Sequence, residues 1–367
     1  MNILSLFDGI STGYLALKNI GIKIDNYYSS EIDKYANAVS EYHFPEIIRL
    51  GDINNWHNWN IEWDKIDLIL AGSPCQGFSI AGKGLNFEDP RSKLFFEFTE
   101  ILNYIKSKNP KVLFLLENVK MKKEWQTVIT NYVKVEPIEI NSALLSAQSR
   151  KRLYWTNIKN ITQPEDKKIL LKDIIENGFV DREKSLTLDA HYYQCVLQDY
   201  IIKKRRQIIF SPKQIGFIGK GGQGQRIYST DGKSVTLQAN GGGLGAKTGL
   251  YAIASRGINI VNNERKDIKG AKTKQRYETS FSEKSNCLTK VQKDSLLLAI
   301  KNNEVIIRKL YPVECERLQT LPDNFTLYGK FDDKIKIISN TQRYKMLGNG
   351  WTLKVIEHIL KNIKEEK

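Results

Sequence analysis

The chain has 367 residues, 41% of them hydrophobic and 10% aromatic, and a formal net charge of +15. This length and apolar content suit one large domain or two with a proper core, and they exclude a chain too polar to fold. The excess of positive charge favours a polyanionic partner, most often nucleic acid. A lysine-rich surface from an AT-rich genome explains the charge equally well.

The four cysteines exclude two structural classes. Cys75, Cys195, Cys287 and Cys315 lie far apart, with no CxxC pair and no histidine at ligand spacing. We therefore expect no metal site and no disulfide scaffold, and we expect a reducing compartment. The N-terminal stretch 1–9 has no charged leader, and no apolar run is long enough to span a bilayer. These features predict a soluble, cytoplasmic protein with no membrane partner.

In chain order, short apolar runs alternate with amphipathic stretches through the first 160 residues. The periods predict helices at 12–21 and 92–108. They predict strands at 2–7, 26–31, 47–52, 66–72, 112–118, 135–140 and 152–158. This alternation is typical of an α/β fold with a doubly wound, mixed but mainly parallel sheet. In such a sheet, ligands bind outside the carboxyl ends of the strands.

The composition changes after about residue 165. Residues 175–305 are rich in Gly, Lys, Ser, Thr and Gln, with short β-like runs and no helical period. The stretch 343–363 predicts a turn followed by an amphipathic helix. We expect a first domain over 1–174, a second, smaller, β-rich domain over 175–325, and a C-terminal segment, 326–367, that returns to the first domain.

The ends of the first three predicted strands suggest a nucleoside pocket. The glycine turn FDGISTG (7–13) lies between a strand and a helix, which suits close approach of a cofactor to the backbone. Glu31 follows the second strand, where a carboxylate could bind ribose hydroxyls. Asp52 follows the third and could accept from an exocyclic amine. A plain tight turn explains the glycines almost as well.

The fourth predicted strand leads into AGSPCQGFS (71–79), where Cys75 lies at a turn. A cysteine thiolate at such a position could attack carbon 6 of a pyrimidine ring. Glu117 could hydrogen-bond ring nitrogen 3. Arg150 and Arg152 would share one side of a strand, giving cations for a base carbonyl and for a backbone or cofactor group. A packed cysteine, a helix-capping glutamate and a solvated arginine face are the structural alternatives.

Five motifs occur in an informative order. They are FDG (7–9), SPCQ (73–76), ENV (117–119), QSRKR (148–152) and GNG (348–350). This series resembles the DNA (cytosine-5) methyltransferases over nearly the whole chain outside 175–305. The resemblance implies a Rossmann-like methyltransferase fold that binds S-adenosyl-L-methionine. It also implies that Cys75 attacks a flipped-out cytosine and that carbon 5 then takes the methyl group.

The resemblance also assigns residues to the site. The implied catalytic residues are Cys75, Pro74, Glu117, Asn118, Arg150 and Arg152. The implied cofactor-binding residues are Phe7, Asp8, Gly9, Ile10, Thr12, Glu31, Ile32, Asp52, Ile53, Ser73, Asn349, Gly350 and Trp351. Many members have an aromatic residue at the position of Ile32, so stacking on the adenine would fall to Phe7 or Ile53.

Two motifs depart from the frequent family forms. FDGISTG replaces FxGxGG and GNGW replaces GNS, and both lean toward the animal de novo methyltransferases, as does RSKLFFEF (91–98). The chain has no cysteine-rich or reader domain in front of its catalytic part. We therefore expect a bacterial or phage enzyme.

The variable region would read the DNA sequence. By the resemblance, 175–305 is a target-recognition region, and 308–325 is a motif that packs it, in which Cys315 is structural. The residues that we expect to contact double-stranded DNA are Gln76, Ser79, Lys83, Lys203, Arg205, Lys220, Gln223 and Arg226.

We expect a monomer that acts alone or beside a cognate restriction endonuclease, with no stable complex between the two. The alternatives are a tRNA cytosine-5 methyltransferase of the same fold and a catalytically silent DNA-binding regulator. The long variable region speaks against the first of these, and the intact Cys75, Glu117 and Arg152 speak against the second.

Overall fold

The computed structural model describes residues 1–73, 90–195, 200, 203, 205–210, 214–217, 226–228, 253–258, 260–261, 264–265, 274–279 and 307–366. The contacts within it divide the chain into two units. The first consists of residues 1–174, 184–207 and 311–367, and the second of 175–183 and 208–310.

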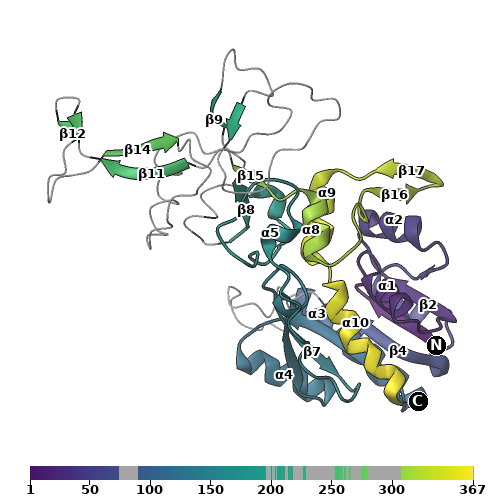
Figure 1. Ribbon diagram of the computed structural model, residues 1–367. Coiled ribbons are helices and arrows are strands. Elements are labelled where there is room, and N and C mark those ends of the chain that lie inside the picture. The colour runs from purple at the N-terminus through teal and green to yellow at the C-terminus, as the bar shows by residue number, and fades with distance from the viewer. Residues whose placement is uncertain are drawn as a thin grey trace. The chain divides into compact units, whose positions relative to one another are not determined.

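The first unit is built on one mixed sheet (Figure 1), which within the described residues has seven strands in the order β3-β2-β1-β4-β5-β7-β6. The strands are β1 (Asn2–Leu6), β2 (Asn26–Ser30), β3 (Ile48–Arg49), β4 (Ile66–Ala71), β5 (Leu113–Val119), β6 (Pro137–Asn141) and β7 (Lys151–Thr156). The first five in chain order pair in parallel, and β7 is antiparallel to both β5 and β6. The predicted doubly wound, mainly parallel sheet is confirmed.

The central strands are apolar because both faces of the sheet are covered. Leu4, Ile69 and Leu116 are fully buried, as expected for parallel strands with helices packed against them. The helices of this unit are α1 (Thr12–Asn19), α2 (Lys34–His43), α3 (Pro90–Lys108), α4 (Lys123–Val133), α5 (Leu171–Ile174), α8 (Pro312–Leu318), α9 (Asn340–Asn349) and α10 (Leu353–Leu360). A hairpin, β16 (Tyr328–Phe331) and β17 (Lys334–Ile337), packs on α2.

The C-terminal helix packs on the first helix of the first unit. In Figure 1 the yellow α10 lies beside the purple α1, and the two helices are in contact. Asn19 donates to Glu357 over 2.7 Å, which ties the end of α1 to α10. The last motif of the chain is thereby brought to the same sheet as the first.

Two local predictions were wrong. The strand expected at 47–52 is paired only at Ile48–Arg49, because Asp52 caps a 3-10 helix, Ile53–Asn58, by accepting from the N–H of Asn54. The turn expected from 343 is instead the end of α9. The side chains of Arg343, Tyr344 and Leu347 are buried along that helix, which explains why the segment is helical despite Gly348.

The described part of the second unit consists largely of short antiparallel β-ladders. They pair β8 (Ile208–Phe210) with β15 (Ile307–Lys309), β9 (Gln214–Phe217) with β10 (Arg226–Tyr228), β11 (Ile253–Ile258) with β14 (Lys274–Thr279), and β12 (Ile260–Val261) with β13 (Glu264–Arg265). The predicted β character of this region agrees with these pairs. The second domain expected at 175–325 is longer than the second unit of the structure. Residues 184–207 and 311–325 belong to the first unit.

Candidate active site

The sheet brings several of the predicted residues to one edge. The turn after β1, Glu31 after β2 and Ser73 after β4 lie beyond the carboxyl ends of parallel neighbours. Glu117 and Asn118 lie near the carboxyl end of β5, which is parallel to β4. This is the edge at which open α/β sheets bind ligands.

The turn after β1 is wound tightly enough to offer its backbone N–H groups. Phe7, Gly9 and Ser11 all have φ between 58° and 59°, in the left-handed region that only glycine adopts without strain. The N–H of Gly9 donates to Glu31 Oε2 over 2.8 Å. The first loop and the end of β2 are therefore joined directly, as a shared nucleoside pocket requires.

Glu31 is held by three backbone donors. Its other oxygen, Oε1, accepts from the N–H groups of Ile32 (2.8 Å) and Asp33 (2.7 Å). Burial raises the pKa of the Glu31 carboxyl above its ordinary value, and these backbone hydrogen bonds act in the opposite direction. The carboxylate is fixed at the end of β2, where it could accept from vicinal hydroxyls.

The Asp8 side chain lies inside the protein. It accepts from four hydroxyls, Ser5 and Tyr27 on Oδ1 and Ser11 and Ser29 on Oδ2, over 2.5 to 2.9 Å. Burial raises the pKa of the Asp8 carboxyl, and the hydroxyl bonds oppose this. The Asp8 side chain therefore stabilises the loop from inside the protein. Any contact between Asp8 and a cofactor would come from its backbone.

The remaining expected cofactor residues differ in exposure. Ile32 is 73% exposed, whereas Ile53 is 3% exposed and packs in the main apolar cluster with Phe7 partly buried against it. Ile53 has little surface left for a ligand, so Phe7 fits the adenine-stacking role better. Ile10, Thr12 and Ser73 are buried, and Asp52, Gly350 and Trp351 are partly buried, while Asn349 is exposed.

Glu117 is the polar centre of the site. Its Oε1 forms an ion pair with Arg152 Nε at 2.8 Å, and its Oε2 accepts from Trp351 Nε1 at 3.2 Å. The side chains of Glu117 and Arg152 are 12% and 13% exposed. A carboxyl group and a guanidinium therefore meet in a largely desolvated place, which strengthens their interaction.

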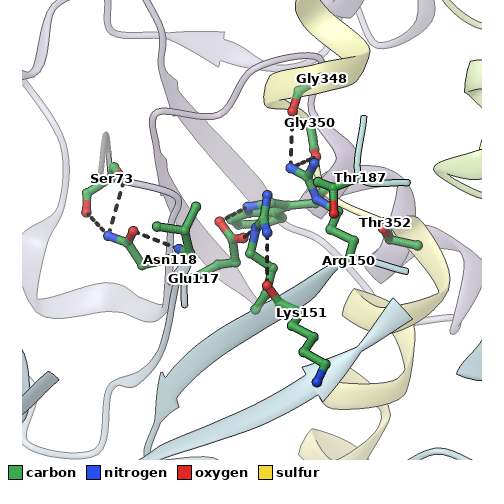
Figure 2. A network of polar contacts seen from close by, with 12 residues as sticks. Ser73, Glu117, Asn118, Arg150, Lys151, Thr187, Gly348, Gly350 and Thr352 are labelled. Carbon is green, nitrogen blue, oxygen red and sulfur yellow. Dashed lines mark hydrogen bonds and ion pairs between the residues drawn. The ribbon is translucent and has the colours of Figure 1, made fainter. Parts of the chain in front are cut away.

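Asn118 connects β5 to the segment that leads to Cys75. Its Nδ2 lies 3.3 Å from Ser73 Oγ and 3.5 Å from Ser73 O, and its Oδ1 accepts from the N–H of Val119 (Figure 2). Asn118 is 2% exposed, so these contacts are shielded from water. It holds the residue that stands two positions before Cys75.

Arg150 acts on the backbone. β7 begins at Lys151, and the guanidinium of Arg150 donates to the carbonyls of Leu188 (2.8 Å), Gly348 (3.1 Å) and Gly350 (3.2 Å), as Figure 2 shows for the last two. The side chain is 5% exposed. Among the roles considered for Arg150, these contacts fit the binding of backbone carbonyls. Its burial contradicts the alternative of a solvent-exposed arginine on a strand face.

The last motif is held by residues that the sequence analysis did not single out. Gln319 Nε2 donates to the carbonyls of Leu347 and Gly350, and its Oε1 accepts from Thr352 Oγ1. A Cβ on Gly348 would lie 2.2 to 2.3 Å from the backbone of Asp189 and Ala190. Gln319 lies in the stretch 308–325 that the resemblance had already marked, but nothing in the neighbouring sequence indicated which residues it would bind.

Several expected residues lie outside the described part of the chain or carry no described side chain. Pro74, Cys75, Gln76, Ser79, Lys83, Lys220 and Gln223 lie outside the described residues. Arg226 belongs to β10, and Lys203 and Arg205 are exposed. Cys315 is fully buried, in agreement with a structural role.

In the described ranges, no three histidine, cysteine or acidic side chains come together as metal ligands, and no helix there is long and apolar enough to cross a membrane.

A family model for the C-5 cytosine-specific DNA methylases matches residues 1–365. The chain belongs to this family. It is 30% identical to the type II methyltransferase M.HhaI of Haemophilus parahaemolyticus over 390 residues, which cover 99% of this chain and 94% of that protein. It is 27% identical to the orphan methyltransferase M.SPRI of Bacillus phage SPR, over 99% of this chain and 97% of that protein.

Solved structures support the fold independently. The Entamoeba histolytica methyltransferase EhMeth matches with a TM-score of 0.57 and 16% identity, over 100% of this chain and 99% of that one. A mutant DNMT2 of Spodoptera frugiperda matches with a TM-score of 0.53 and 19% identity, over 99% of both chains. This member of the DNA methylase family is a DNA cytosine-5 methyltransferase built on the Rossmann-like methyltransferase fold.

Proposed function

We propose that the protein transfers a methyl group from S-adenosyl-L-methionine to carbon 5 of a cytosine flipped out of double-stranded DNA, at a specific short sequence. The observation that carries this proposal is the pairing of Glu117 with Arg152 and Trp351 at the carboxyl edge of the sheet, beside Ser73. At that edge β1, β4 and β5 are neighbouring strands, and the segment that contains Cys75 follows β4 in the sequence.

The residues described after β1 and β2 fit the cofactor. Glu31 offers a fixed carboxylate for ribose hydroxyls, and the N–H of Gly9 fixes one of its oxygens. The loop supplies no lysine that would favour a phosphate group. When bound, S-adenosyl-L-methionine supplies an electrophilic methyl group on its sulfonium sulfur.

The chain's own residues prepare the cytosine. The Cys75 thiolate forms a bond from sulfur to ring carbon 6, while a proton shared between Glu117 and ring nitrogen 3 offsets the negative charge that develops on the ring. The same carboxyl group accepts from the exocyclic amino group, and Arg152 contacts the base carbonyl. The electron pair released toward carbon 5 would form the new bond to the methyl carbon while the bond from that carbon to the sulfonium sulfur breaks, so that S-adenosyl-L-homocysteine leaves as a neutral thioether. A base, assisted by water, then removes the proton from carbon 5, and β-elimination releases Cys75.

The other expected roles belong to this proposal. Asn118 holds the segment at Ser73, and Pro74 shapes the turn before the nucleophile. We propose that residues 175–305 contribute the target-recognition surface for DNA. A cognate restriction endonuclease would act on the same sequence without forming a stable complex, and the enzyme would act as a monomer.

Mechanism-based trapping tests the covalent step. A fluorine at carbon 5 cannot leave as a proton does, so DNA that contains 5-fluorocytosine should remain bonded to Cys75 after methyl transfer. We expect a protein–DNA complex that survives a denaturing gel, only with S-adenosyl-L-methionine present and not with Cys75→Ser. A complex formed equally by the serine variant would contradict the assigned nucleophile. Trapping on fluorinated tRNA but not on DNA would contradict the assigned substrate.

A further inference from the structure

The indole of Trp351 contacts three segments that carry the site. Its Nε1 donates to Glu117 Oε2 over 3.2 Å. A Cβ on Gly72 would lie 2.9 Å from the same Nε1 and 3.3 Å from Cε2 and Cζ2, so the ring packs directly on the backbone after β4. A Cβ on Gly13 would lie 3.6 Å from Cζ3, which places the other end of the ring against the start of α1.

The backbone beside this indole is held from both sides. The carbonyl of Gly350 accepts from Arg150 Nη2 at 3.2 Å and from Gln319 Nε2 at 3.3 Å. On the other side, Thr352 donates its hydroxyl to Gln319 at 2.8 Å. With its neighbours fixed and its ring packed against glycine backbone, the indole N–H has little freedom to point elsewhere.

The contact completes the orientation of the Glu117 carboxyl. Arg152 holds Oε1 and Trp351 holds Oε2, so each oxygen has one N–H donor. The terminal torsion of a glutamate is broad and roughly two-fold, so one donor alone leaves the plane of the carboxyl group loosely defined. Two donors on different oxygens set that plane.

We propose that Trp351 is a positioning residue for Glu117, in addition to the cofactor contact expected of it. The inference rests on the proposed function, because it assumes that Glu117 must meet the edge of a flipped cytosine. It predicts that the indole N–H serves the methyl-transfer step, whereas the ring surface serves packing and cofactor binding. The two contributions can be separated, because phenylalanine keeps an aromatic ring and removes the donor.

The test compares Trp351→Phe with Trp56→Phe. Trp56 is a matched control, since its Nε1 also donates to a glutamate, Glu97 Oε2, over 3.1 Å, but on α3 and not in the expected site. We expect Trp351→Phe to slow single-turnover methylation of plasmid DNA about tenfold, as for a lost hydrogen bond to a charged group. Its dissociation constant for S-adenosyl-L-methionine should stay within about twofold of the wild type. Trp56→Phe should change neither quantity by more than about twofold.

A double-mutant cycle asks whether Trp351 acts through Glu117. In Glu117→Asp the carboxylate is one methylene shorter and should no longer reach the indole, so adding Trp351→Phe should slow the reaction less than about twofold. Trp351→His, which retains an N–H on a smaller ring, should recover part of the rate and also serves if the phenylalanine variant does not fold. Equal slowing by Trp351→Phe in both backgrounds, or a loss explained entirely by weaker cofactor binding, would overturn the inference.

The same assay separates this inference from the function on which it rests. A wild-type protein that methylates no cytosine in DNA would contradict the proposed function and the inference together. An active wild type whose rate is unchanged in Trp351→Phe would contradict the role of Trp351 alone.

Discussion

At the scale of single residues, the carboxylates after β2 and in β5 are oriented in different ways. Glu31 is held by three backbone N–H groups, while Glu117 is held by the side chains of Arg152 and Trp351. Backbone donors make Glu31 a rigid acceptor. Each oxygen of Glu117 has one side-chain donor and can still take part in a second hydrogen bond with a substrate. This difference agrees with one carboxylate for cofactor binding and one for chemistry.

Arg152 should resist replacement by lysine. Its Nε, 2.8 Å from Glu117, belongs to a planar fork that an ammonium group does not reproduce. We expect Arg152→Lys to lower the single-turnover methylation rate about 10- to 100-fold, as for the loss of a charged hydrogen bond. Arg317→Lys is the control, because Arg317 pairs with both oxygens of Asp323 elsewhere. A methylation rate within twofold of the wild type for Arg152→Lys would refute this role of Arg152.

The raised pKa of Glu31 predicts a pH dependence of cofactor binding. Burial, the largest cause, shifts the pKa of Glu31 upward from its ordinary value, so the carboxylate takes up a proton at a higher pH than a free glutamate would. The ionised form should bind ribose hydroxyls better. Affinity for S-adenosyl-L-methionine should therefore fall as pH is lowered from neutrality through that raised pKa.

Calorimetric titration of wild type and Glu31→Gln over a pH series measures this effect. The glutamine variant should bind about tenfold more weakly near neutral pH and should lack the acidic loss, because it has no proton to take up. The difference between the two curves isolates Glu31 from His43 and His358, which titrate in both proteins. Parallel curves would show that Glu31 does not bind the cofactor as an anion.

At the scale of elements, the turn between α9 and α10 depends on one glycine. Gly348 lies in the last turn of α9, where helix propensity alone predicts that alanine would stabilise the protein by about 1 kcal/mol. Packing predicts the opposite, because the new Cβ would lie 2.2 to 2.3 Å from the backbone of Asp189 and Ala190. The close approach should prevail, since backbone cannot move aside as a flexible side chain can.

We expect Gly348→Ala to lower the free energy of unfolding by about 1–3 kcal/mol, the usual range for overpacking. Chemical denaturation followed by circular dichroism would measure it, with Thr341→Ala at an exposed position of the same helix as the control. A gain in stability for Gly348→Ala would mean that α9 does not press on the 188–190 segment.

Much of the sheet could be predicted from sequence because its strands are local apolar runs. The run 66–72 became β4, Ile66–Ala71, and 112–118 became β5, Leu113–Val119, within one residue at each end. The start of α9 was not predictable in the same way. Its burial depends on partners such as Glu316, which pairs with Arg343 across 27 positions of sequence.

The site was predictable to a similar extent and for the same reason. Motif spacing brought Glu117, Arg152 and Trp351 into the set of expected residues, but their mutual contacts join positions up to 234 apart. The inward-facing Asp8 could not be foreseen either, because its four hydroxyl partners come from three segments of chain. Sequence identified the chemical groups, and long-range packing decided which of them meet.

At the scale of the whole molecule, the net charge of +15 should make the affinity for DNA depend on salt concentration. Neutralising phosphates releases counterions, so affinity should fall steeply with salt. We expect about a hundredfold loss of affinity for duplex DNA between 50 and 200 mM salt, which corresponds to about four neutralised phosphates. Fluorescence anisotropy with a labelled duplex would measure the slope. An affinity independent of salt would mean that the positive charge lies away from the DNA.

We propose above that this enzyme methylates cytosine at carbon 5 in a specific DNA sequence, with Cys75 as the nucleophile. Base-resolution methylation sequencing of plasmid DNA, from a host that lacks its own cytosine methylation, tests it most directly. We expect 5-methylcytosine at one short recurring sequence with the wild-type chain, and none with Cys75→Ser. A folded wild-type protein that binds S-adenosyl-L-methionine but leaves no 5-methylcytosine in any context would rule out the proposed activity. An unchanged methylation pattern from the serine variant would rule out Cys75 as the nucleophile.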